Sequence, residues 1–224
     1  MQRVQLLIFD WDGTLADSAA QIVAAMQGAI RGLGLPARED EAIRELIGLG
    51  LNEGLQKLYP ELDLEWLRRL LDGYRARWLS EGAGEAPLFA GALQAIETLH
   101  EAGFRIAIAT GKSRRGLDRS LRHHHELRSR VINSRCADET ASKPDPLMLR
   151  ELLREEGLAA DQALMIGDTE YDAAMAQAIG MPALGVACGV HHPERILRAG
   201  ALALIPSVRE LPDWIVTERQ GSAS

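Results

Sequence analysis

A regular alternation of helical and strand patterns, which begins at residue 92, constrains the fold more than any other feature of the sequence. A helical pattern over 92–102 precedes an apolar strand pattern over 104–109, and a helix followed by a strand then recurs three times. Alternation of this kind predicts a parallel sheet with helices on both of its faces. The later elements are expected at these positions: a helix from 113, a strand over 131–133, a helix over 146–156, a strand over 163–166, a helix over 170–179, and strands over 183–186 and 202–205.

One more strand, Val4 to Phe9, is expected near the N-terminus, and the chain that follows it reads as helices alone. Apolar side chains recur at helical spacing from Ile22 to Leu33. The stretch 81–87, rich in glycine and alanine, reads as a linker. Further helices are expected over 39–47, 52–59 and 63–79.

This block of helices interrupts the α/β pattern directly after the first strand, so we expect it to be a cap inserted into the core. We predict a Rossmann-like, doubly wound parallel sheet core formed by residues 1–15 and 86–224, with a helical cap formed by residues 16–85. Hinges are expected near Ala16–Asp17 and Gly82–Gly84, where the chain enters and leaves the cap.

The charge and hydropathy of the chain exclude some classes of binding partner. A net charge of -7 and a pI near 5.4 argue against a nucleic acid or an anionic membrane surface as the main partner. The apolar run Leu6–Phe9 is too short for a signal peptide or a membrane span. Cys136 and Cys188 have neither CxxC nor metal-site spacing, which predicts free thiols. We therefore expect a cytoplasmic protein whose partner is a small molecule.

Four separate segments carry polar residues suited to catalysis. The first strand delivers Asp10 and Asp12, two apart on extended chain, so that both side chains can leave the same side of the backbone. The second strand delivers Thr110, the turn before a later helix holds Lys143, and a later strand delivers Asp168. Because ligands bind beyond the carboxyl ends of parallel strands, we expect these side chains in one crevice.

These segments resemble the four motifs of the haloacid dehalogenase-like superfamily, most of whose members are phosphatases and phosphotransferases. The motifs stand in the family's order: DxDGT at 10–14, Thr110 after an apolar strand, Lys143, and GDxxxD at 167–172. The resemblance extends from residue 4 to residue 205, and the inserted helices stand where the family carries an α-helical cap. The subgroup that the chain resembles most is the phosphoglycolate phosphatase-like hydrolases.

The resemblance implies roles for the two carboxylates of the first motif. Asp10 would be the nucleophile, which takes the phosphoryl group as an aspartyl-phosphate and passes it to water. Asp12 would protonate the leaving alkoxide and then deprotonate the attacking water. Because haloacid dehalogenases need no carboxylate at the second position, Asp12 favours phosphate chemistry over dehalogenation.

The resemblance also implies a Mg²⁺ ion, which would offset the repulsion between carboxylates and a phosphate dianion. Its ligands would be Asp10, the backbone carbonyl of Asp12 and Asp168, with waters completing an octahedron. Asp172 would lie one helical turn after Asp168 and orient the waters of the metal. With this ion and a basic residue, an acidic chain can bind an anionic substrate.

Four further positions are expected to serve the phosphoryl group. The hydroxyl of Thr110 and the amide of Gly111 would donate hydrogen bonds to its oxygens. Gly13 would permit the tight turn that brings backbone amides close to the phosphate. Lys143 would place a positive charge beside Asp10 and the transferring group.

The predicted function is therefore a Mg²⁺-dependent phosphatase that hydrolyses a small phosphomonoester similar to phosphoglycolate. A β-phosphoglucomutase-like phosphotransferase is the main alternative, but segment 47–54 lacks the arginine that the caps of such mutases carry. A pyrophosphatase and a non-enzymatic regulatory protein are further alternatives, and the complete set of aspartates argues against the second. Segment 49–52 offers mainly backbone and one amide, which suggests a small substrate without strong charge recognition.

Several residues near the expected crevice have two open placements. Lys112 could lean toward the substrate or lie at the surface, and His191 and His192 could border the crevice or lie outside it. The run His123–His125 is expected at the surface, because consecutive helical residues point in different directions and cannot easily chelate one ion. The pattern does not indicate an oligomeric state.

The aromatic side chains are expected to pack rather than to bind. Trp11 lies between the two catalytic aspartates in sequence, but it points to the opposite side of an extended chain. Trp66, Tyr74 and Trp78 are spaced by eight and four residues, which favours the core of the cap over a cage for substrate.

Overall fold

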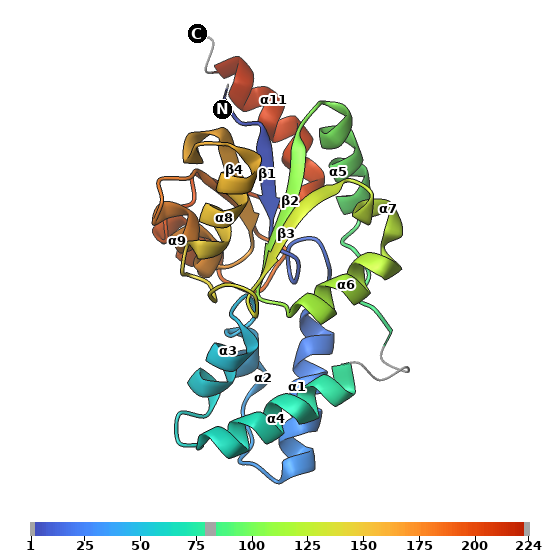
Figure 1. Ribbon diagram of the computed structural model, residues 1–224, viewed down its shortest axis with the longest axis vertical. Helices are drawn as coiled ribbons and strands as arrows, with labels where there is room; N and C mark the ends of the chain where they lie inside the picture. Colours follow the sequence, from blue (N-terminus) through green and yellow to red (C-terminus); the bar gives the residue numbers. More distant parts are fainter. Residues whose placement is uncertain (1–2, 79–83, 222–224) are drawn as a thin grey trace.

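The computed structural model describes residues 3–78 and 84–221, which are built around a six-stranded sheet (Figure 1). Neighbouring strands run parallel, in the order β3-β2-β1-β4-β5-β6. The strands are β1 (Leu6–Phe9), β2 (Arg105–Thr110), β3 (Val131–Cys136), β4 (Ala163–Gly167), β5 (Ala183–Val186) and β6 (Ala203–Ile205). The strand order reverses between β1 and β4, and that switch point is where such sheets bind ligands.

Helices cover both faces of this sheet, as the alternating sequence pattern predicts. They are α5 (Ala92–Glu101), α6 (Arg114–His123), α7 (His125–Arg128), α8 (Leu147–Glu156), α9 (Glu170–Gln177), α10 (Pro193–Arg198) and α11 (Leu211–Gly221). Leu7 and Phe9 of β1 pack with residues of α5, α6, α7 and α11 on one face. Leu6 and Ile8 pack with residues of α8, α9 and α10 on the other. Burial on both faces explains why the strand reads as a continuous apolar run.

Between β1 and α5 the chain forms a group of helices that lies beyond the carboxyl ends of the strands (Figure 1). These are α1 (Ala19–Leu33), α2 (Asp40–Arg44), α3 (Leu51–Leu58) and α4 (Leu64–Trp78). Their apolar faces form a third cluster, which includes Met26, Ile30, Leu55 and Leu70. Helix α1 ends at Leu33 and is followed by Gly34, whose left-handed conformation (φ 65°) costs glycine little. We call residues 17–78 the helical insertion; it has an apolar core of its own.

Two chain segments join the sheet to the helical insertion, and they run side by side. The amide of Asp17 donates to the carbonyl of Pro87 (2.9 Å), and the amide of Phe89 donates to the carbonyl of Leu15 (2.9 Å). Residues 81–83, which belong to the predicted linker and to the second predicted hinge, lie outside the described residues. The residue boundaries of the core and cap domains stay a prediction.

The predicted elements are confirmed in kind and order, with shifts at their ends. Strand β1 begins at Leu6 rather than at Val4, and β3 continues to Cys136 because it pairs with β2 beyond a register shift. The helices α10 and α11 were not predicted. Helix α10 starts at Pro193, a residue that interrupts a helical pattern in the sequence but fits the first helical position. None of the described helices combines the length and the apolar character that a membrane span requires.

Candidate active site

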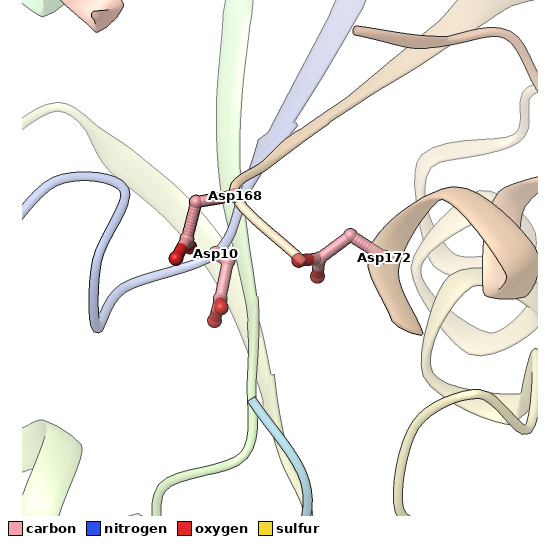
Figure 2. Close-up of side chains that lie close together, drawn as sticks. All are labelled: Asp10, Asp168 and Asp172. Atoms are coloured by element: carbon pink, nitrogen blue, oxygen red, sulfur yellow. The ribbon is translucent and has the colours of Figure 1, made fainter. Parts of the chain in front are cut away.

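Buried carboxylates meet at the switch point of the sheet because β1 and β4 are neighbours. Asp10 directly follows β1 and Asp168 directly follows β4, while Asp172 points toward them from the first turn of α9 (Figure 2). Carboxylate oxygens of the three residues lie within 4.8 Å of one another, and all three side chains are buried. Thr110 ends β2, the other neighbour of β1, and is fully buried. The topology thus brings three distant parts of the chain to one place.

Lys143 is the counter-ion of this carboxylate cluster. Its ammonium nitrogen lies 2.8 Å from Asp10 Oδ1 and 2.6 Å from Asp172 Oδ1 and is fully buried. Asp168 instead accepts hydrogen bonds from the hydroxyl of Thr14 (2.7 Å) and the amide of Val190 (2.9 Å). Two of the three buried carboxylates therefore share one ammonium group, and Asp168 accepts hydrogen bonds from uncharged donors.

Asp10 is the least satisfied member of the cluster. Neither of its carboxylate oxygens accepts a hydrogen bond from any described residue, because the approach of Lys143 to Oδ1 has the distance of an ion pair without the angles of a hydrogen bond. Buried polar atoms without a partner are rare and usually indicate a role in binding or catalysis. The two oxygens without hydrogen bonds and the excess negative charge fit a metal ion, which the carboxylates of Asp10, Asp168 and Asp172 could hold.

Burial controls the ionisation of these groups. It raises the pKa of Asp10 well above its usual value, and the charge of Lys143 only partly opposes the shift. Burial and the neighbouring Asp172 raise the pKa of Asp168 to about 7. Burial alone would lower the pKa of Lys143, but the carboxylates of Asp10 and Asp172 outweigh it and raise that pKa. The lysine therefore stays charged, and the carboxylates need further positive charge to be ionised together.

Asp12 lies apart from this cluster and has its own partners. Its carboxylate accepts hydrogen bonds from the hydroxyl of Ser18 (2.6 Å) and from the ammonium of Lys112 (2.8 and 3.0 Å). The Lys112 side chain is only 8% exposed, and its nitrogen lies 4.8 Å from the ring centre of Trp78 in α4. Lys112 is thus a partner of Asp12 and not a surface residue. Its position two residues after Thr110 was its only sequence signal, and Ser18 was not among the predicted site residues.

Gly13 and Gly111 are approached so closely that a side chain at either position would collide with its neighbours. Gly13 has a φ of 83°, and an added Cβ would lie 2.2 Å from Asp168 Oδ2. An added Cβ at Gly111 would lie 2.4 Å from the backbone carbonyl oxygen of Leu49 in the helical insertion. Gly13 therefore lets the turn after β1 pass beside Asp168, and Gly111 lets the insertion rest on the end of β2.

The helical insertion is also tied to the core through Glu45, which follows α2. Arg195 donates to both carboxylate oxygens of Glu45 (2.7 and 2.5 Å), and the hydroxyl of Tyr171 donates to its backbone carbonyl (3.0 Å). The Nε2 atom of His191 lies 3.3 Å from the same carbonyl. His191 is therefore packed between core and insertion, whereas His192 caps the start of α10. Neither histidine lines the cavity next to Asp10.

A cavity of about 620 Å³ lies between the core and the helical insertion. Asp10, Asp12 and Lys112 line it from the core, and Met26 and Tyr74 are among the residues that line it from the insertion. Such a volume is typical of a small-molecule site. The cavity gives a ligand access to Asp10, the member of the carboxylate cluster that lines it.

Trp11, Tyr74 and Trp78 pack as expected, whereas Trp66 is not part of the apolar cluster of the insertion. Of the histidines expected at the surface, His123 and His125 are exposed and His124 is half-buried. Trp11 is buried in the apolar cluster on one face of the sheet. Tyr74 and Trp78 pack in the cluster of the insertion, with ring centres 6.0 Å apart, but both also line the cavity. His124 contacts the carbonyl of Ala86 through Nε2 (2.9 Å), and the described part of the chain holds no metal cluster that includes the histidine run.

Comparison with known proteins agrees with this architecture. Residues 7–186 match the family model described as haloacid dehalogenase-like hydrolase. The chain is 31% identical over 212 residues to the phosphoglycolate phosphatase of Vibrio cholerae, with 89% of this chain and 91% of that protein covered. It is 33% identical over 212 residues to the probable phosphatase IndB of Dickeya dadantii, with 92% and 91% covered.

A solved structure shows the same fold. The structure of a putative haloacid dehalogenase-like hydrolase from Bacteroides fragilis superimposes with a TM-score of 0.86 at 26% identity, covering 93% of this chain and 99% of that one. The family model and the curated relatives together span both the sheet and the helical insertion. This chain therefore belongs to the haloacid dehalogenase-like hydrolase family and is one of its phosphatases.

Proposed function

We propose that the protein is a Mg²⁺-dependent phosphatase that hydrolyses a small phosphomonoester through an aspartyl-phosphate on Asp10. The observation that carries this proposal is the state of Asp10, whose two buried oxygens accept no hydrogen bond from the described residues while the ammonium of Lys143 lies 2.8 Å away. A nucleophilic carboxylate must keep an oxygen free to attack, and a nearby cation must offset the charge that it brings to the phosphate.

In the first step, a carboxylate oxygen of Asp10 forms a bond to phosphorus while the bond from phosphorus to the alcohol oxygen breaks. Asp12 gives its proton to the departing alkoxide, which leaves as the alcohol. In the second step, Asp12 takes a proton from a water that attacks phosphorus, and the bond to Asp10 breaks, releasing phosphate. Lys143 stays protonated throughout and stabilises the charge on both Asp10 and the phosphoryl oxygens.

The buried carboxylates support a resident Mg²⁺ ion. Asp10, Asp168 and the backbone carbonyl of Asp12 would hold it, with Asp172, which also pairs with Lys143, orienting its waters. When bound, the ion would supply positive charge that lets the carboxylates remain ionised beside an anionic substrate. Thr110 and Gly111, at the end of β2, would donate to the phosphoryl oxygens.

The relatives support phosphoglycolate as the first ester to test. The relative from Vibrio cholerae and a 29% identical relative from Rhodospirillum rubrum both carry the name phosphoglycolate phosphatase. A putative β-phosphoglucomutase from Bacteroides vulgatus superimposes with a TM-score of 0.84, but at 19% identity this likeness concerns the fold alone. The phosphatase reading is therefore preferred to the mutase.

The test is phosphate release from phosphoglycolate and from a generic aryl phosphate, with and without Mg²⁺. We expect turnover that requires the ion, that is lost in Asp10→Asn and that survives in Asp213→Asn, a matched change at an exposed position of α11. Folded wild-type protein without turnover at any pH would overturn the phosphatase proposal. Activity retained in Asp10→Asn would overturn the choice of nucleophile.

A further inference from the structure

The cavity beside Asp10 is large compared with the ester of a two-carbon acid. At about 30 Å³ for each of its nine non-hydrogen atoms, the volume of a water molecule in the liquid, phosphoglycolate would occupy about 270 Å³. The cavity measures about 620 Å³. More than half of it would therefore remain unfilled, although the insertion already touches the core at Gly111.

The wall that the insertion contributes to this cavity is mainly apolar and includes an aromatic pair. Met26, Ile43 and Leu55 line it together with Tyr74 and Trp78. The rings of Tyr74 and Trp78 are nearly parallel, at 15°, with centres 6.0 Å apart. Apolar and aromatic surface of this kind favours an apolar body over a small hydrophilic acid.

This wall stands next to the acid–base residue, where a leaving group must lie. Lys112 contacts the carboxylate of Asp12 at 2.8 Å, and the same ammonium lies 4.8 Å from the ring centre of Trp78. An alcohol oxygen that receives a proton from Asp12 therefore has the aromatic pair within reach of its carbon chain. The apolar wall is thus placed on the leaving-group side of the phosphate.

The cationic side chains around the cavity are not placed to bind a carboxylate group on the leaving group. Lys112 is engaged by both oxygens of Asp12. Arg75 and Arg115 also line the cavity, but both are exposed, and exposed acidic residues such as Asp72 line it too. A glycolate carboxylate would therefore lie near the charge of Asp12 without a dedicated buried cation.

Resting on the proposed phosphatase activity, we infer that the preferred leaving group is an uncharged alcohol with an apolar, aromatic-sized body that packs against Tyr74 and Trp78. The substrate class is then a phosphomonoester of such an alcohol and not a phosphorylated two-carbon acid. A phenyl ring on a two-carbon chain gives an ester of about 390 Å³ on the same scale, which the cavity can accommodate.

The test compares three esters in the presence of Mg²⁺: ethyl phosphate, 2-phenylethyl phosphate and phosphoglycolate. The first two have primary alkyl leaving groups of similar intrinsic reactivity, so their ratio of kcat/KM measures the recognition of the ring. Burial of a ring of this size predicts a ratio of about tenfold to a hundredfold in favour of the phenyl ester. We also expect the phenyl ester to exceed phosphoglycolate.

Two variants of α4 test whether the preference for the phenyl ester depends on Trp78. Trp78→Ala should lower the ratio of phenylethyl to ethyl ester at least about fivefold, because the ring loses part of its packing surface. Trp66→Ala removes the same side chain from the same helix outside the cavity lining, so it should preserve the wild-type ratio. A fall in both variants, or in neither, would contradict the inference.

Inhibition provides a measurement that does not depend on a folded variant. In the wild type, 3-phenylpropylphosphonate, which mimics the phenyl ester, should inhibit at a concentration at least about tenfold lower than propylphosphonate does. Equal inhibition, or a preference for phosphoglycolate over the phenyl ester, would overturn the inference while leaving the phosphatase proposal intact. Turnover of none of the three esters by folded protein would overturn the phosphatase proposal and this inference together.

Discussion

The two sides of the cavity differ in the side chains that line them. The core side presents charged groups, Asp10, Asp12 and Lys112, which lie just beyond strand ends and are held by specific partners. The insertion side presents apolar side chains on helices that have their own cluster, such as Met26 and Tyr74. Charges buried in this way need precise neighbours, whereas an apolar wall tolerates exchange of side chains of similar volume. The reactive groups therefore come from segments at the ends of the strands, whereas we expect the helices of the insertion to select the substrate by its shape.

The largest effect is expected at the core. Asp10→Asn should lower kcat by about 10⁴-fold or more, since the amide cannot form the covalent intermediate. Its melting temperature should equal or exceed that of the wild type, because burial raises the pKa of Asp10 and an ionised group there opposes folding at neutral pH. Phosphate release and a thermal melt measure the two quantities. Clear destabilisation together with retained activity would show that Asp10 serves the stability of the core and not its chemistry.

The next effect concerns the stability of the core. Lys143→Met should lower the free energy of unfolding of the metal-free protein by about 3–5 kcal/mol, because it leaves the carboxylates without their counter-ion. Activity should also fall. The matched change Lys112→Met, on the cavity side, should cost less stability because Lys112 pairs with one carboxylate and not two. Equal losses in urea unfolding would show that the two sites do not differ as proposed.

Metal binding should stabilise the core by a smaller amount. At a Mg²⁺ concentration a hundredfold above Kd, the free energy of unfolding should rise by about 2.7 kcal/mol. Asp168→Asn should lose most of this gain because it removes a carboxylate from the cluster. Thermal melts across a Mg²⁺ titration measure the effect, and Asp213→Asn is the control. The same gain in all three proteins would exclude Asp168 from the metal site.

A change at the contact between the two regions should have a modest effect. Arg195→Met removes the ion pairs to Glu45 of the insertion and to Glu170 of the core, at an expected cost of about 1 kcal/mol for partly exposed groups. Arg198→Met, on the same helix, removes an exposed pair within α10 and should cost little. Urea unfolding compares the two. Equal results would mean that Arg195 does not hold the insertion on the core.

The smallest effect is a pH dependence at the same contact. Burial and the charge of Arg195 lower the pKa of His191, so the folded protein favours the neutral ring. Stability that depends on this ring is therefore present above the ordinary histidine pKa near 6.5 and is lost as pH falls from there through the lowered pKa. His191→Gln should reduce this loss in urea unfolding between pH 7.5 and pH 5.5. An unchanged pH profile would show that His191 does not cause the loss of stability.

The sequence predicted much of the fold because the core repeats one simple pattern. Continuous apolar strands alternating with amphipathic helices allow few arrangements other than a parallel sheet with two covered faces. Helix α10 was not predicted because a proline such as Pro193 usually interrupts a helix, and the sequence does not show that it stands at the first helical position. The convergence of Asp10, Thr110 and Asp168 was expected for the same topological reason, since strand ends meet at one edge. Lys143 was expected to join them from the turn before a helix.

The partners of the site side chains were harder to predict. Apart from its position two residues after Thr110, nothing in the sequence distinguishes Lys112 from a surface lysine, and only packing places it between Asp12 and Trp78. The same holds for His191, which lies between core and insertion and not at the cavity. Both contacts join residues that are far apart in the chain, so no local pattern encodes them.

The sequence alone thus determined the α/β core, the place of the inserted helices and the set of charged residues at the strand ends. Each of these features follows from hydrophobic periodicity or from a short sequence motif, which can be recognised within a short stretch of the chain. The volume and the apolar wall of the cavity follow from the packed structure alone, as does the lack of hydrogen bonds from described residues to the two buried oxygens of Asp10. Those features depend on how the insertion rests on the sheet, which is set by the summed packing of many distant side chains.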